Sequence, residues 1–161
     1  MAIAYISLGS NLGSKLHNIN KAVALIAEEC GTINNISAFY ETEPWGFESD
    51  KKFLNQVLSL TTGLTPSELL SGLLSIEKMM GRTRERSRTY TSRIIDLDIL
   101  FYDQKIIREE NLTIPHPQIQ NRSFILVPLM EIAASFVHPQ LNKTIERLTQ
   151  DCMDNSFIRK I

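Results

Sequence analysis

The chain has 161 residues, of which 43% are hydrophobic and 22% are charged, a composition typical of soluble globular proteins and not of disulfide-dense scaffolds. At this length a folded chain buries roughly two thirds of the surface that it exposes when unfolded, so we expect one domain, residues 1–161, with a sizeable core. Seventeen Lys and Arg against eighteen Asp and Glu give a formal net charge of -1, which argues against a whole-body binder of nucleic acid or acidic membranes.

The cysteines and the first residues of the chain indicate the cellular compartment in which we expect the protein. Cys30 and Cys152 form no Cys-x-x-Cys pair or Cys/His cluster, so neither a disulfide framework nor a structural zinc site is expected. The chain opens without a basic leader, and no stretch approaches the ~18 apolar residues of a membrane span. We therefore expect a mature, soluble, cytoplasmic protein with no membrane partner.

The first half of the chain predicts alternating strands and helices. Residues 2–8 alternate small and large apolar side chains, as a buried strand does, and glycines at 9–13 end it. Apolar residues at steps of three and four over 16–30 predict a helix. Runs rich in β-branched and aromatic residues predict strands at 33–42 and 53–62, joined by an irregular loop.

The second helix has a clear start, because Thr65-Pro66-Ser67-Glu68 combines an N-cap hydroxyl, a proline at the first helical position and the glutamate of a capping box. We expect it to end at Gly81. Its predicted core-facing residues are Leu69, Leu70, Leu73, Leu74, Ile76 and Met80. A basic loop over 82–92 follows, and residues 93–102 then alternate as a strand. One predicted face carries Ile95, Leu97, Ile99 and Phe101, and the other carries Ile94, Asp96, Asp98, Leu100 and Tyr102.

These elements follow the order βαββαβ, the split pattern of ferredoxin-like α+β folds, in which helices pack on a mainly antiparallel sheet. The rest of the chain is expected to add short elements to this βαββαβ unit. We expect a short strand at 105–108, an extended segment at 115–117, a helix at 128–133 that starts near Pro128 without running through it, and a short helix at 145–148.

Asp96 and Asp98 are an i, i+2 pair on one strand, so both carboxylates project to one side, about 7 Å apart at the backbone. Magnesium commonly takes one or two carboxylates and completes its octahedron with substrate phosphates. An Asp-x-Asp pair alone is more often part of a solvated face. Leu100 and Tyr102 on the same predicted face favour a lined site instead.

The basic loop holds five of the nine arginines of the chain within twelve residues: Arg82, Arg84, Arg86, Arg88 and Arg93. Guanidinium groups bind phosphate oxygens bidentately, so the loop suits a triphosphate, although a solvated loop or an unspecific nucleic-acid patch has the same composition. The loop leads directly into the strand with both aspartates. Phosphate and cation ligands therefore emerge side by side, as phosphoryl transfer requires.

A third group of residues suits a planar heterocycle. Its rings are Trp45, Phe47, Phe53 and Phe124, and its polar members are Thr42 and Asn55. Isolated phenylalanines are more often core residues. His116, between two prolines, and Arg122 could hold phosphate oxygens, although a lone histidine is more often structural. Residues 9–15 have the wrong glycine spacing for a P-loop, so we expect phosphate binding from arginines and metal.

Seven runs occur in the order found in one known family. They are Gly9-Ser10-Asn11-Leu12-Gly13, Tyr40-Glu41-Thr42-Glu43-Pro44 with Gly46, Phe53-Leu54-Asn55, Glu77 before Gly81-Arg82-Thr83-Arg84, Arg93-Ile94-Ile95-Asp96-Leu97-Asp98-Ile99-Leu100, Pro115-His116-Pro117 and Asn121-Arg122-Ser123-Phe124. Over nearly its whole length the chain thus resembles the 6-hydroxymethyl-7,8-dihydropterin pyrophosphokinases of folate biosynthesis. The resemblance implies transfer of diphosphate from ATP to the hydroxymethyl oxygen of the pterin, with two Mg²⁺ ions and release of AMP.

The resemblance also implies roles for individual residues. The metal ligands would be Asp96 and Asp98, which with Arg82 and Arg93 form the catalytic set. ATP would be bound by Glu77, Arg82, Arg84, Arg88, Tyr90, Arg93, His116 and Arg122. The pterin would be bound by Thr42, Trp45, Phe53, Asn55 and Phe124.

The chain departs from the family pattern in places. Thr89-Tyr90-Thr91-Ser92 stands where an Arg-Trp-Gly-Pro run is usual, so Tyr90 takes the place of the tryptophan, and either Arg88 or Arg86 takes that of the arginine. Trp45 stands where an aliphatic residue is common, and Leu74 and Asn111 stand at positions sometimes held by polar or basic ATP contacts.

Two other functions are alternatives to a pyrophosphokinase. RNA-recognition modules share the βαββαβ order, but residues 53–57 lack the basic-Gly-aromatic run that such a module needs. A non-catalytic small-molecule sensor would keep the aromatic slot but has no use for acids beside five arginines. We expect a monomer that binds small molecules and no nucleic acid. The loop at 82–92, with 44–52 as a second lid, is expected to close over the nucleotide.

Overall fold

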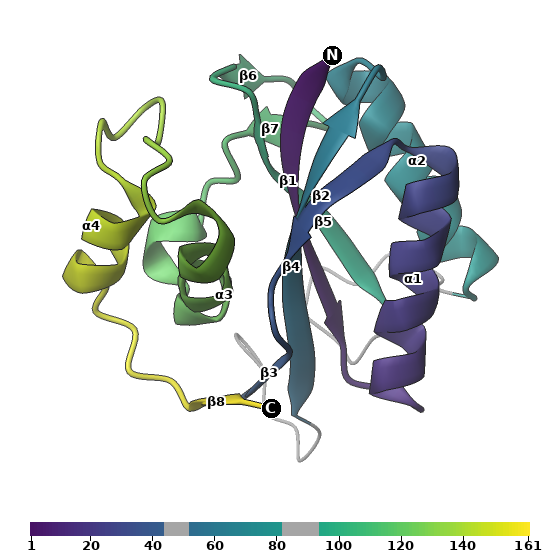
Figure 1. The fold of residues 1–161 in the computed structure, drawn as a ribbon, viewed down its shortest axis with the longest axis horizontal. Coiled ribbons are helices and arrows are strands. Elements are labelled where there is room, and N and C mark those ends of the chain that lie inside the picture. Colours follow the sequence, from purple (N-terminus) through teal and green to yellow (C-terminus); the bar gives the residue numbers. More distant parts are fainter. Residues whose placement is uncertain (44–51, 82–93) are drawn as a thin grey trace.

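A computed structural model describes residues 1–43, 52–81 and 94–161 of the chain. Within these residues an antiparallel sheet lies between two layers of helices, with α1 and α2 on one face and α3 and α4 on the other (Figure 1). The strands of this sheet are β1 (Ala2–Ser10), β2 (Thr32–Ile36), β3 (Tyr40–Thr42), β4 (Phe53–Thr62), β5 (Asp96–Tyr102) and β8 (Ile158–Lys160). The helices are α1 (Lys15–Glu29), α2 (Pro66–Met79), α3 (Ser123–Ala133) and α4 (Ile145–Asp151). The predicted α+β class with an antiparallel sheet is confirmed.

The sheet has the strand order β5-β1-β4-β3-β8, and β2 also pairs with β4. The predicted strand at 53–62 is confirmed as β4, and β1 continues two residues beyond the predicted end, to Ser10. The single strand predicted at 33–42 is wrong, because it is divided into β2 and β3. Residues 37–39 bulge out of the ladder there, and the Ser37 hydroxyl accepts the backbone N–H of Val57 at 3.0 Å.

The caps of α2 confirm the boundaries read from its sequence. The Thr65 hydroxyl accepts the N–H of Glu68, and the Glu68 carboxylate accepts the N–H of Thr65, which completes the capping box. Gly81 follows the helix with a φ of 89°, a conformation that glycine adopts without strain. The predicted inward face is wrong at one position, since Leu74 is 36% exposed whereas Leu73 is 1% exposed.

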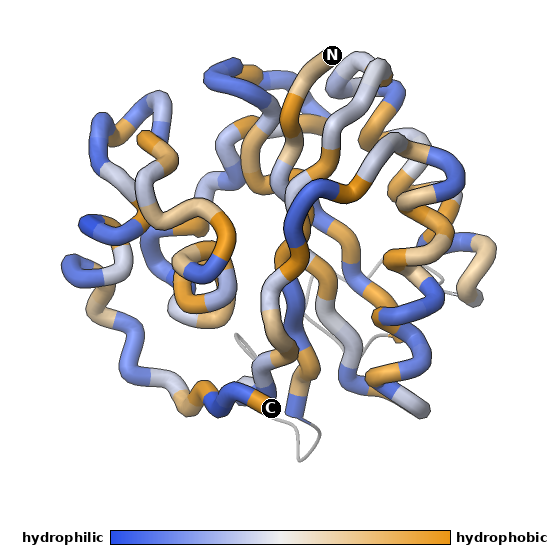
Figure 2. Tube along the Cα trace, in the orientation of Figure 1, coloured by the Kyte–Doolittle hydropathy of each residue, from blue (hydrophilic) through white to orange (hydrophobic). Residues whose placement is uncertain are grey.

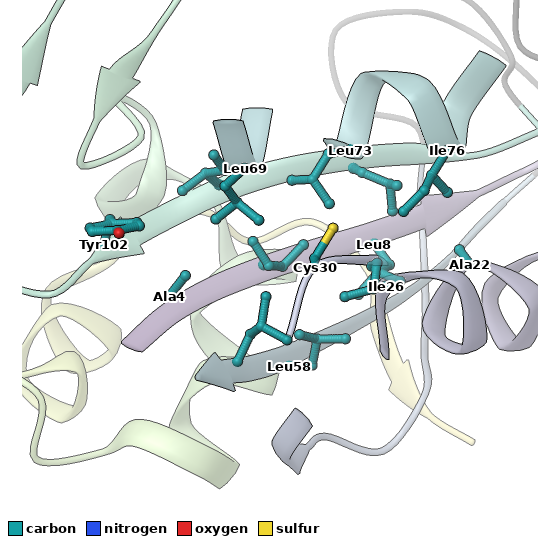
Figure 3. Packing of buried hydrophobic residues seen from close by; sticks show 14 of the residues in the cluster. Ala4, Leu8, Ala22, Ile26, Cys30, Leu58, Leu69, Leu73, Ile76 and Tyr102 are labelled. Carbon is teal, nitrogen blue, oxygen red and sulfur yellow. The ribbon is translucent and has the colours of Figure 1, made fainter. Parts of the chain in front are cut away.

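The core between the sheet and α1/α2 is apolar. Figure 3 shows Leu69, Leu73 and Ile76 of α2 and Ala22 and Ile26 of α1 directed at Ala4, Leu8 and Leu58 of the central strands. Hydrophobic and hydrophilic residues recur along both helices in Figure 2, as expected when one side of a helix packs on a sheet and the other meets water. This core gives β1, β4 and β5 a rigid support on one face.

A bulge in β5 changes which side chains face this core. The pairing with β1 shifts register between Tyr5 and Ile6, so that Leu100 becomes an extra residue. Beyond it Phe101 belongs to the core on the α3 side, and Tyr102 belongs to the core on the α1/α2 side. The predicted alternation therefore holds up to Ile99, and the faces predicted for the last two residues are wrong.

The helix predicted to start near Pro128 instead begins at Ser123 and runs through the proline. A proline inside a helix removes one backbone hydrogen bond and costs about 3 kcal/mol. The burial of Ile125, Leu126 and Leu129, each at most 2% exposed, offsets this cost in the core on the α3 side. The predicted helix at 145–148 is confirmed as part of α4.

The remaining elements are short. β6 (Ile107–Arg108) and β7 (Thr113–Ile114) form a separate hairpin, which overlaps the strand predicted at 105–108, and a 3-10 turn spans Ile119–Asn121. No helix in the described residues is long and apolar enough to cross a membrane.

A pair of neighbouring leucines tests the orientation of α2. Leu73→Ala should lower the free energy of unfolding by about 2–5 kcal/mol, because it opens a cavity in the core. Leu74→Ala should lower it by less than about 1 kcal/mol, since that side chain already meets water. Urea denaturation of both variants measures the difference, and equal losses would show that the helix is rotated.

Candidate active site

The candidate site is a cleft on the sheet face that carries α3. Strand register sets Asp96, Gly9, Asn55 and Tyr40 side by side on β5, β1, β4 and β3. The cleft contains about 650 Å³ of space, open solvent at its mouth included. Its lining residues are Ser7, Leu8, Gly9, Thr42, Glu43, Phe53, Asn55, Gln56, Asp96, Asp98, Arg122, Phe124 and Ile125.

Asp96 and Asp98 both line this cleft and are half-buried, so the solvated outer face that was the alternative for this pair does not apply. Alternation along β5 directs both carboxylates to the same side. Within the described residues no group of three or more His, Cys, Asp and Glu could hold a metal ion by itself. Two carboxylates fit Mg²⁺, which commonly binds one or two of them and takes its other oxygens from water and phosphate.

Glu77 lies behind the aspartate strand. Its side chain is 2% exposed, and one carboxylate oxygen accepts the backbone N–H of Leu97, the residue between Asp96 and Asp98, at 2.9 Å. β5 is an edge strand in the described sheet, so this N–H has no neighbouring strand to bond. Glu77 therefore helps to fix the segment that carries the two aspartates, and the ATP contact implied for it stays a prediction.

The opposite end of the cleft contains a preformed polar pair. Asn55 is 6% exposed and its amide group donates to the Thr42 hydroxyl at 2.6 Å. Phe53 stands opposite Thr42 in the ladder between β3 and β4. The two residues predicted to meet the polar edge of a heterocycle are thus in contact, and a predicted stacking ring lies next to them.

Gly9 forms part of the cleft wall between the aspartates and this polar pair, a role that sequence reasoning missed. A Cβ at this position would lie 3.1 Å from the Asn55 side-chain oxygen and 3.6 Å from the Phe53 ring. This approach is tight, so a side chain at position 9 would push the Asn55 amide by a few tenths of an ångström. The signal in the sequence is the glycine itself, but a glycine after an apolar run predicts the end of a strand, whereas β1 continues to Ser10.

Arg122 and Phe124 line the cleft from the start of α3. Arg122 is only 7% exposed, and its guanidinium carbon lies 5.6 Å from the centre of the Phe124 ring. This is a cation–π distance, so the two side chains support each other in the cleft wall. Phe124 is a lining residue here and not only a core residue.

His116 is held close to Arg122 and Asp96. Its backbone N–H donates to the Leu100 carbonyl at 3.0 Å, and its Nδ1 accepts the N–H of Gln118 at 3.1 Å. Burial lowers the pKa of His116 to about 4, with a further lowering by Arg122 that Asp96 partly opposes. The imidazole is therefore neutral at pH 7 with its proton on Nε2, and it offers a hydrogen-bond donor without a positive charge.

Several predicted site residues lie outside the described residues, which end at 43 and 81 and resume at 52 and 94. They are Trp45, Phe47, Arg82, Arg84, Arg86, Arg88, Tyr90 and Arg93. The expected lids at 44–52 and 82–92 also lie outside them, apart from Lys52. The described cleft brings together Thr42, Phe53, Asn55, Asp96, Asp98, Arg122 and Phe124.

The neutral state of His116 can be tested by NMR. We expect its imidazole nitrogens to show the Nε2–H tautomer and to remain untitrated down to about pH 5. Between the usual pKa of 6.5 and the folded pKa of about 4 the unfolded chain binds more protons, so His116 should lower stability as the pH falls through this window. His116→Asn should remove this part of the pH dependence. An imidazole that titrates near pH 6.5 would contradict the assignment.

A family model and named relatives match most of this chain. The family model for 7,8-dihydro-6-hydroxymethylpterin-pyrophosphokinase matches residues 5–134. The relative from Aquifex aeolicus is 42% identical over 91% of this chain and 89% of its own, and that from Haemophilus influenzae is 38% identical over 99% and 98%. Both are named 2-amino-4-hydroxy-6-hydroxymethyldihydropteridine pyrophosphokinase.

Solved structures share the fold. A protein named HPPK-DHPS, crystallised with substrates, matches with a TM-score of 0.74 at 18% identity, and the Plasmodium falciparum HPPK-DHPS matches with a TM-score of 0.76 at 19% identity. The match covers 93% of this chain and 43% and 44% of theirs, so this chain spans less than half of their length. From the family model and the sequence relatives together, this chain belongs to the 7,8-dihydro-6-hydroxymethylpterin-pyrophosphokinase family.

Proposed function

We propose that the cleft between β5, β1, β4 and α3 is where this enzyme transfers diphosphate from ATP to the hydroxymethyl group of 6-hydroxymethyl-7,8-dihydropterin and releases AMP. Family membership makes the chain a diphosphokinase of folate biosynthesis that uses ATP as co-substrate. The observation that carries the assignment to this cleft is the presence of two cleft-facing aspartates and the Asn55–Thr42 pair in one wall.

The acidic end would bind the nucleotide through metal. Asp96 and Asp98 would hold two Mg²⁺ ions, which would neutralise phosphate charge and lower the pKa of the attacking hydroxyl. Glu77 keeps these two ligands in register through the Leu97 backbone. Arg122 and the Nε2–H of His116 would meet phosphate oxygens, and Arg82, Arg84, Arg88, Tyr90 and Arg93 would complete the ATP site together with Glu77.

The other end would bind the pterin. Asn55 and Thr42 would meet the polar edge of the ring, and their mutual hydrogen bond fixes the amide before the substrate arrives. Phe53 and Phe124 would supply apolar contact, with Trp45 as a further contact. Gly9 lies between Asn55 and Asp96 in the strand register, so a ring bound over it could direct its hydroxymethyl group toward the metal ligands.

The reaction needs no covalent intermediate with the enzyme. The hydroxymethyl oxygen attacks the β-phosphorus, a new P–O bond forms, and the bond from the β-phosphorus to the bridging oxygen of AMP breaks. The hydroxyl proton leaves to solvent. The contribution of the chain is to align the two substrates and to balance charge, with the aspartates beside cationic Arg122 and neutral His116.

We also propose that the fold is ferredoxin-like, with β2 and β3 together as one strand of the βαββαβ unit. The order β5-β1-β4-β3 and the antiparallel pairing support this topology. Residues 1–161 would form a single domain that acts as a monomer in the cytoplasm, without a nucleic-acid or membrane partner. A non-catalytic sensor is disfavoured, since it has no need of two cleft-facing carboxylates.

The aspartate assignment is tested by substitution. Asp96→Asn and Asp98→Asn keep side-chain size but remove charge, so each should lower kcat at least about a hundredfold, with little change in melting temperature. Asp151→Asn, at an exposed ion pair with Lys143 and Arg147, is the matched control and should keep wild-type activity. Phosphorus NMR should show AMP as the stoichiometric product, and ADP in its place would refute the proposed reaction.

The role of Gly9 is tested by adding one methyl group. Gly9→Ala should displace the Asn55 amide and raise the Kd for 6-hydroxymethyl-7,8-dihydropterin by about tenfold, with a smaller effect on ATP. Gly63→Ala meets only the flexible Met1 side chain and serves as control. Calorimetric titration measures both constants. An unchanged pterin Kd in Gly9→Ala would mean that the ring does not bind over this residue.

A further inference from the structure

The segment from Asp154 to Lys160, which follows α4, contacts both sides of the cleft. It lies beyond residue 134, where the match to the family model ends. In Figure 1 it runs from α4 past the lower end of α3 to β8, beside β3. None of its residues lines the cleft in the described part of the chain. Any effect of this segment on the reaction must therefore act through the residues that it holds.

Asp154 holds the first residue of α3. One carboxylate oxygen accepts the backbone N–H of Ser123 at 3.0 Å and its hydroxyl at 3.1 Å. The other accepts the N–H and the hydroxyl of Ser156 at 2.9 and 2.5 Å. Ser123 stands between Arg122 and Phe124, the two α3 residues proposed to contact ATP and the pterin. A displacement of Ser123 would displace both of them.

The charge of Asp154 suits this position. Burial raises the pKa of its carboxyl, but hydrogen bonds from Ser156 and Ser123 outweigh this effect and hold the pKa below its usual value. The group is therefore ionised at neutral pH, and a negative charge is favoured at a helix N-terminus. Arg122, the N-cap residue of α3, makes no side-chain capping bond, so the carboxylate comes from a distant part of the chain.

The same segment also supports the pterin wall. In β8, Ile158 stands opposite Thr42 and Lys160 opposite Tyr40. The Lys160 ammonium lies 3.7 Å from the Glu131 carboxylate of α3, which also accepts the Tyr40 hydroxyl. The segment thus joins β3 to α3 along the side of the cleft that carries Thr42 and Phe124.

We propose that Asp154 is a positioning residue of the pyrophosphokinase site, which by holding Ser123 sets the placement of Arg122 and Phe124 over the two substrates. This inference rests on the proposed function of the cleft. The simpler alternative is a helix cap that contributes stability alone. Thr144 offers the comparison, because its hydroxyl caps α4 by accepting the N–H of Arg147, away from the cleft.

The experiment compares Asp154→Ala with Thr144→Ala in the full chain. Calorimetry measures the Kd for 6-hydroxymethylpterin and for α,β-methylene-ATP with Mg²⁺, and thermal unfolding measures stability. Both variants should lose a helix cap and melt at a lower temperature. Asp154→Ala should in addition raise both Kd values by about tenfold, because small displacements of binding groups are costly, whereas Thr144→Ala should leave both within about twofold. Asp154→Asn, which keeps one acceptor oxygen for Ser123, should restore part of the loss.

The outcomes separate this inference from the proposed function. If Asp154→Ala melts earlier but keeps both Kd values, Asp154 only stabilises the fold and the inference is overturned. If Asp154→Ala fails to fold, Asp154→Asn takes its place with a smaller expected rise in both Kd values, and wild-type Kd values in that variant would overturn the inference. If the wild-type protein forms no AMP from ATP and the dihydropterin, the proposed function fails, and the positioning role fails with it.

Discussion

The site depends on the register of β1 between β4 and β5. Antiparallel pairing of the same strand on both sides aligns Asp96 with Gly9 and Gly9 with Asn55. A slip of one residue on either side would turn the aspartates or the amide to the opposite face, into the core under α1 and α2. That core, which contains Ala4, Ile6 and Leu8 of β1, therefore does more than stabilise the fold, because it fixes the register on which the opposite face relies.

The two ends of the cleft are prepared in different ways. At the end proposed to bind the pterin, the polar groups already bond each other, so Asn55 and Thr42 would lose little freedom when a ring binds. At the end proposed to bind metal, two half-buried carboxylates lie on the same side of one strand, where cations would balance their charge. A neutral His116 adds a donor there without adding charge. In the proposed site, the charge of the nucleotide end would be balanced once metal and phosphate bind, whereas the polar pair at the pterin end is formed before the ring binds.

Local signals were sufficient for much of this arrangement. The capping box of α2, the extent of β4 and the shared face of Asp96 and Asp98 follow from adjacent residues, and all three are confirmed. The wrong predictions concern elements whose structure depends on contacts with residues distant in the sequence. α3 passes through Pro128 because its other residues are buried between the sheet and α4, and Leu100 is an extra residue in the pairing of β5 with the distant strand β1. Neither constraint is visible in a window of the sequence.

The segment after α4 likewise has no local sequence signal for its strand or for its contacts with α3. β8 has three residues, two of them basic. It is a strand because it pairs with the edge of β3. The proposed role of Asp154 depends on its hydrogen bonds with Ser123, thirty-one positions away in the sequence. The residues proposed to contact substrates lie in recognisable runs, because binding chemistry restricts their type. The residues that orient them are restricted only by where they lie in the fold, so any short acceptor at the right distance could serve. Sequence patterns therefore identify the binding groups of such a site more readily than the residues that hold them in place.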